Sequence, residues 1–152
     1  MLFNGFPGII IGVLIFLGCL IVVSRRSPGS SFKFDADNPG DFEKLLAMYI
    51  DLGKFLLGLA SGSIVLLVGS SALHSTARLP ASYASPLFLL TISIFYGILF
   101  MAFLLVNYED HRHHPHADTY KRRRYTRNTA LGWSMLGCFV VGYFWLVVIV
   151  TA

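Results

Sequence analysis

The sequence predicts an all-α membrane protein in which four transmembrane helices form one bundle over residues 1–152. Four long apolar runs predict the helices, because a helix needs about 20 apolar residues to cross the hydrocarbon of a bilayer. None of the runs contains an ionisable acid or base, and nearly all such residues lie in two of the three loops. The hydrophobic fraction of 55% and the mean hydropathy of +0.67 fit a bundle solvated by lipid. The runs cover approximately residues 6–23, 55–73, 87–106 and 130–150.

The distribution of Lys and Arg predicts the orientation of the bundle. All of them except Arg78 lie in the first loop, residues 24–54, or in the third loop, residues 107–129. Arg78 lies in the short second loop, residues 74–86. Because basic loops stay on the cytoplasmic side, the first and third loops are predicted to be cytoplasmic and both termini external. The acidic residues share these two loops, so the predicted external face is small and nearly uncharged.

The first span is followed by a loop that divides into two parts. Residues 24–38 are rich in Ser, Gly, Pro and Asp, which is typical of an irregular linker. From Asp41 onward, apolar residues recur at helical spacing, and only Gly53 separates this segment from the second span. We therefore expect one long helix from about Asp41 to Leu73, whose first part extends the second span into the cytoplasm.

The third and fourth spans also have recognisable ends. Ser85 and Pro86 suit the first positions of a helix, so they predict the start of the third span. Pro115 suits the first turn of a helix that continues into the fourth span as a second short cytoplasmic extension. Trp133 and Trp145 are typical of the two membrane interfaces of that span.

Small residues at a spacing of four predict close contacts between helices, because they let two backbones approach each other. The first and second spans each carry one G-x-x-x-G, and the fourth span carries a longer stripe. Packing within the bundle is the favoured interpretation, since four helices must first cover one another, and homo-oligomerisation through one stripe is the alternative. The residues are Gly8 and Gly12, then Gly58 and Gly62, then Ala130, Ser134, Cys138 and Gly142.

The third loop contains every histidine except His74. Imidazole and carboxylate groups bind Zn²⁺ and Ni²⁺, so a divalent metal site is one hypothesis for this segment. A pH-responsive loop is a second, because histidine titrates near neutrality. The spacing matches no closed zinc motif, which favours a solvated hinge between the third and fourth spans. The candidate ligands are His111, His113, His114, His116 and Asp118.

The basic run that follows predicts contact with anionic lipid headgroups or with a protein partner. A basic cluster beside a membrane is attracted to anionic lipid, and it also fixes the topology. Its small size and its place at the membrane surface argue against binding to nucleic acid. The residues are Lys121, Arg122, Arg123, Arg124 and Arg127.

The apolar runs also exclude classes of function. Ion-coupled transporters and pumps need ionisable residues inside the membrane, and no motif for nucleophilic catalysis or phosphate binding occurs, so no catalytic residue and no cofactor is predicted. We therefore expect a non-enzymatic structural or accessory subunit of a membrane, most simply the bacterial inner membrane, that docks a partner or itself through its cytoplasmic face. The alternative is a homo-oligomeric passive pore lined by hydroxyls of the second span. A metal- or pH-responsive His-rich loop is the third hypothesis.

Overall fold

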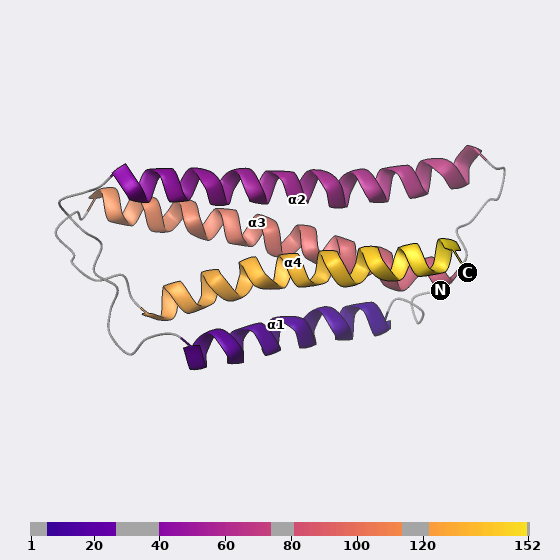
Figure 1. The fold of residues 1–152 in the computed structure, drawn as a ribbon, viewed down its shortest axis with the longest axis horizontal. Coiled ribbons are helices and arrows are strands. Elements are labelled where there is room, and N and C mark those ends of the chain that lie inside the picture. Colours follow the sequence, from indigo (N-terminus) through magenta and orange to yellow (C-terminus); the bar gives the residue numbers. More distant parts are fainter. Residues whose placement is uncertain (1–5, 27–39, 74–80, 114–121, 152) are drawn as a thin grey trace.

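The computed structural model describes residues 6–26, 40–73, 81–113 and 122–151, and the described chain is almost entirely α-helical. Helices α1 (Phe6–Arg26) and α2 (Gly40–Leu73) are followed by the short 3₁₀ helix η2 (Ala81–Tyr83). Helices α3 (Ala84–His113) and α4 (Arg122–Thr151) complete the fold. The four long helices lie side by side along one axis, and successive helices run in opposite directions (Figure 1).

The helix bounds follow from the local sequence. Helix α2 is continuous from Gly40 to Leu73, which matches the single helix expected from about Asp41. Helix α3 continues past the end of its apolar run at Val106 and reaches His113. No glycine or proline interrupts this polar part, and the helix ends shortly before Pro115, which disfavours helical backbone in the residue before it.

The start of the helix expected from Pro115 lies outside the described residues. Helix α4 is described from Arg122 onward, and from there it runs without a break to Thr151. It thus includes the last part of the predicted third loop, residues 122–129, as well as the whole of the fourth apolar run. Consequently the third loop is shorter in the structure than the apolar runs alone imply.

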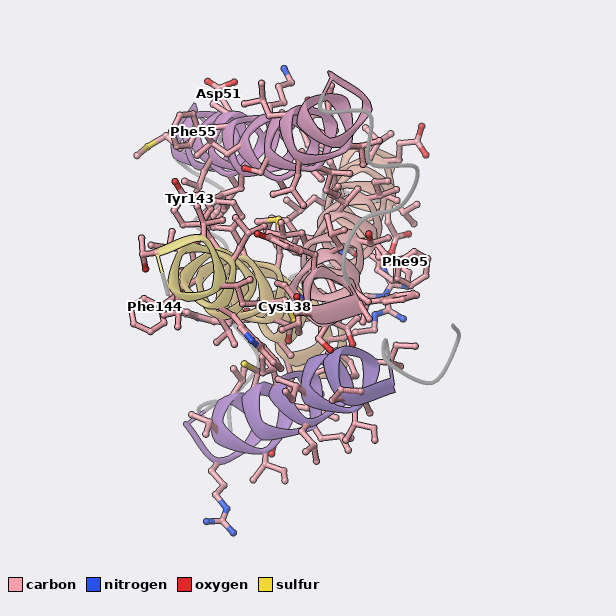
Figure 2. All side chains as sticks on the ribbon, turned by 90° about the vertical axis from the view of Figure 1, so that its right-hand side faces the viewer. Asp51, Phe55, Phe95, Cys138, Tyr143 and Phe144 are labelled. Atoms are coloured by element: carbon pink, nitrogen blue, oxygen red, sulfur yellow. The ribbon has the colours of Figure 1, made fainter. Side chains whose placement is uncertain are left out.

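Helix α3 is the central element of the bundle. It packs most extensively against α4 and also contacts both α1 and α2, whereas α2 touches α4 only slightly. Viewed from one end, α2 lies on one side of the α3–α4 pair and α1 on the other (Figure 2). The best-buried side chains accordingly belong to α3 and α4, among them Leu89, Leu90, Met135 and Cys138.

The outer surface of the bundle is strongly apolar. Leu66 is 75% exposed, Phe144 69% and Val65 68%, which are values that large aliphatic and aromatic side chains rarely have in a protein surrounded by water. Phe95 and Phe144 point away from the bundle on opposite sides, while Cys138 lies between the helices (Figure 2). Such a surface needs lipid around it.

Four helices are long and apolar enough to cross a membrane, and each candidate span overlaps one of the four apolar runs. The chain is therefore an integral membrane protein with a helical bundle. The spans are Pro7–Arg25, Ala47–Gly69, Ala81–Asp110 and Thr126–Thr151.

Candidate functional site: the charged end of the bundle

The alternating helix directions bring the end of α1, the start of α2, the end of α3 and the start of α4 to one end of the molecule (Figure 1). Every Asp, Glu, Lys and Arg of the described helices lies in the half of its helix nearer this end. We call it the charged end and define it by those charged residues whose side chains are described. They are Arg25, Asp51, Lys54, Glu109, Asp110, Arg124 and Arg127.

One ion pair links two helices at the charged end. The Arg124 guanidinium of α4 donates a hydrogen bond through Nη1 to Oδ2 of Asp110 on α3. Both side chains remain partly exposed, at 38% and 46%, so solvent screens their attraction. An exposed pair of this kind stabilises a fold by less than about 1 kcal/mol. Its main effect is therefore to fix how the polar ends of α3 and α4 face each other.

A second arginine on α4 has an aromatic partner. The guanidinium carbon Cζ of Arg127 lies 3.8 Å from the ring centroid of Phe103 on α3, within the range of a cation–π contact. Nearby on α2, Lys54 Nζ lies 4.0 Å from Asp51 Oδ1, one helical turn away. The charged end therefore combines paired charges with at least one arginine that rests on a ring.

Helix α2 brings apolar side chains to the charged end as well. Met48 is 66% exposed and Leu52 is 53% exposed, and they lie on either side of Asp51 in the sequence. Tyr49, although 45% exposed, makes an edge-to-face contact with Phe100 of α3, with ring centroids 6.1 Å apart. This part of α2 thus packs on α3 while presenting a mixed apolar and charged surface outward.

The G-x-x-x-G of the first span lies against α3. A Cβ atom added at Gly8 would come within 2.5 Å of the backbone oxygen of Ser85, and one at Gly12 within 3.0 Å of the Ile92 side chain. Tyr96 adds to this contact, because its ring stacks on Phe16 with centroids 5.4 Å apart and its hydroxyl donates a hydrogen bond to the Gly12 carbonyl at 3.4 Å. Sequence reasoning missed the role of Tyr96.

The G-x-x-x-G of the second span, unlike that of the first, does not lie against a neighbouring described helix. A Cβ atom added at Gly58 or Gly62 would meet no described atom within 4 Å. Helix α2 instead contacts α3 through another face, on which Gly53, Leu56 and Ala60 are buried. Gly53 and Ala60 are small residues seven positions apart, a spacing that marks this face and that the G-x-x-x-G pattern does not contain.

The stripe predicted on the fourth span is buried. Ala130, Ser134 and Cys138 are fully enclosed, and a Cβ atom at Gly142 would lie 3.1 Å from Cβ of Leu89. The stripe therefore lies where α4 meets α3. Cys138 forms no disulfide, and neither does Cys19, the other cysteine.

Most described hydroxyls in the spans bond to the backbone of their own helix. Ser61 donates to the Leu57 carbonyl, and Ser63 donates to the Leu59 carbonyl at 2.8 Å. Ser93 is an exception, because it is buried and donates across the helix interface to the Met135 carbonyl at 2.7 Å. A hydroxyl has one donor, so these serines have no further hydrogen to offer a molecule passing along the helix.

The predicted metal site falls almost entirely outside the described residues. His111 and His113 belong to the last turn of α3, but their side chains are not described, and His114, His116 and Asp118 are outside the described chain. Within the described residues, no group of three or more His, Cys, Asp or Glu side chains could hold a metal ion. The metal site stays a prediction.

The basic run is described only in part. Arg122 and Arg123 lie in the first turn of α4, but their side chains are not described. The structure describes the side chains of Arg124 and Arg127, and Lys121 is outside the described residues. No family model, curated protein or solved structure matches the chain. Its function must therefore be argued from its own residues.

Proposed function

We propose that this protein is a non-enzymatic structural or accessory subunit of a membrane assembly, which docks a partner protein or a second copy of itself through the charged end. The observation that carries the proposal is that charged side chains gather at one end of the bundle, whereas the spans are apolar. Acids and bases of the described helices gather toward one end, and the spans offer serines that are already hydrogen-bonded. Among the described residues, the charged side chains that could recognise the surface of a partner protein lie at the charged end.

The helix lengths support a projecting surface at this end. Helices α2 and α3 contain 34 and 30 residues, which correspond to about 51 Å and about 45 Å at 1.5 Å per residue. The hydrocarbon of a bilayer is only about 30 Å thick. Because the polar residues of both helices lie toward the charged end, we infer that the excess length projects there, as an extension of α2 packed on α3.

We further propose that the charged end faces the cytoplasm and that the membrane is a bacterial inner membrane. The orientation rests on the excess of Lys and Arg in the connections at this end. The same basic residues, Lys121 through Arg127, are proposed to contact anionic lipid headgroups beside the docking surface.

Extraction from native membranes in mild detergent, followed by mass spectrometry of the intact complex, tests the docking proposal. We expect a stoichiometric complex with either a second protein or a further copy of the chain. A matched variant in which Asp51 and Lys54 are replaced by Asn and Gln should reduce the amount of complex without changing the helix content. A strictly monomeric protein in every extraction would contradict the proposal.

A homo-oligomeric passive pore is the second candidate, and one observation favours it. Gly58 and Gly62 are uncovered by the described residues, so two copies of α2 have room to approach closely. The hydrogen bonds of Ser61 and Ser63 to their own helix count against a polar lining. Conductance of the purified protein in planar bilayers separates the candidates, since a pore must pass ions and an accessory subunit must not.

A further inference from the structure

Two arginines of the basic run, Arg124 and Arg127, lie three residues apart on α4 but have different partners. The charge of Arg124 is matched by Asp110 on the neighbouring helix. The guanidinium of Arg127 lies over the ring of Phe103, 3.8 Å from its centroid, and the side chain is exposed. A ring face attracts a cation but carries no net charge, so the ring does not offset the charge of Arg127 as a carboxylate would.

The described acids do not neutralise Arg127. Asp110 pairs with Arg124, and Asp51 lies beside Lys54. Among the described side chains, Arg127 forms no ion pair with a carboxylate. The cation–π contact uses no carboxylate, and the planar guanidinium carries five N–H donors. These donors match two oxygens of one phosphate group.

The position of Phe103 along the bundle favours a lipid headgroup as the source of such a phosphate. Phe103 lies 19 positions after Ala84, the first residue of α3, so the two are about 29 Å apart along the helix. This distance equals the hydrocarbon thickness of a bilayer, and Phe103 lies within one turn of Val106, where the apolar run of α3 ends. The phosphates of lipids lie just outside the hydrocarbon, in a layer of about 5–7 Å on each side.

We propose that Arg127, held in place by Phe103, binds the phosphate group of an anionic phospholipid in the leaflet at the charged end. Arg124 instead links α4 to α3 through Asp110 and contributes little to lipid binding. The inference rests on the proposed contact of the basic run with anionic lipid, and it assigns that contact to one residue and one supporting ring.

The test is a lipid titration of the detergent-purified full-length protein, followed by native mass spectrometry. Phosphatidylglycerol is compared with phosphatidylcholine of the same acyl chains, using wild type, R127Q and R124Q. We expect wild type to prefer phosphatidylglycerol and R127Q to bind the first phosphatidylglycerol about fivefold more weakly, the factor that corresponds to about 1 kcal/mol for one basic residue near an anionic surface. R124Q removes the same charge from the same helix and should change this affinity by less than about twofold.

Equal binding of phosphatidylglycerol by R127Q and wild type would overturn the proposal, and so would equal losses in R127Q and R124Q, which indicate a diffuse basic surface. If R127Q does not fold, F103L provides the test, because it keeps the charge and removes the ring. F103L should weaken phosphatidylglycerol binding about twofold, in line with the strength of an exposed cation–π contact, and unchanged binding would overturn the proposal.

A last arm separates lipid from free phosphate. Inorganic phosphate at millimolar concentration should not displace phosphatidylglycerol, and displacement would overturn the assignment to a lipid headgroup. Failure of this proposal is distinguishable from failure of the proposed function, since R127Q is also extracted from membranes and examined for its protein partner. If R127Q loses the preference for phosphatidylglycerol but still forms the protein complex, the result bears on the lipid contact of Arg127 and not on the docking function.

Discussion

Gly8 lies where the backbones of α1 and α3 approach so closely that a single methyl group does not fit. The obstacle at this point is the backbone oxygen of Ser85, which cannot move aside as a flexible side chain does. Gly58 also lies in an apolar helix, yet a Cβ atom added there would meet no described atom within 4 Å. The two glycines therefore form a natural pair for measuring the effect of one methyl group.

We predict that Gly8→Ala destabilises the bundle by about 1–3 kcal/mol, because α1 must move away from α3 to relieve the overlap. Gly58→Ala should leave the stability unchanged or raise it slightly, since alanine is the better helix former. Thermal or denaturant unfolding in detergent, followed by circular dichroism, measures both. Equal stability of the two variants would contradict the close contact at Gly8.

At the scale of the elements, the two faces of α2 differ in what lies against them. Its buried face contacts α3 through Gly53, Leu56 and Ala60, whereas the face that carries Gly58 and Gly62 meets no described atom at those glycines. Small residues spaced four positions apart therefore identify a helix face that is able to pack closely against another helix. It does not identify which neighbour, if any, lies against it.

We predict that the double variant Gly58→Leu/Gly62→Leu keeps the helix content and the stability of the isolated bundle. A Cβ atom at either position meets no described atom within 4 Å, so we expect little strain within one copy. Circular dichroism and unfolding in detergent check the fold, and a loss of stability as large as that of Gly8→Ala would contradict the prediction. In the same samples, loss of a homo-oligomer would support self-association through α2.

The elements themselves were largely predictable, and the pairing of their faces was not. Apolar runs of about 20 residues located the four helices, and the unbroken pattern from Asp41 predicted the length of α2. The contact of Tyr96 with Phe16 and Gly12 depends on the rotation and depth of α1 against α3. Periodicity within one helix carries no information about the rotation of a second helix.

The candidate site was predictable only in its composition. The sequence alone indicated that charge gathers in the first and third loops, and alternating helices must bring those loops to one end. The division of roles between Arg124 and Arg127 was not predictable, because it depends on which residue of α3 lies opposite each of them. In the sequence the arginines of the run are equivalent, and only the position of α3 gives them different partners.

At the scale of the whole molecule, the separation of charged and uncharged ends makes the orientation testable. We predict that a cysteine at Ser30 reacts with a membrane-impermeant maleimide only after the cells are opened, whereas one at Ser82 reacts in intact cells. The reason is the retention of basic loops on the cytoplasmic side. The background variant replaces Cys19 and Cys138 by Ala, and reaction at Ser30 in intact cells would reverse the assigned topology.

The four helices also differ in length, and the shortest has a consequence for the choice of membrane. Helix α1 contains 21 residues and is about 31 Å long, nearly equal to the hydrocarbon thickness of an average bilayer. The longer helices accommodate a thicker bilayer by exposing less of their length to water. The described length of α1 does not exceed the hydrocarbon thickness enough to do the same. Hydrophobic mismatch therefore acts first on α1, and lipids with longer acyl chains should weaken its contact with α3 before they affect the rest of the bundle.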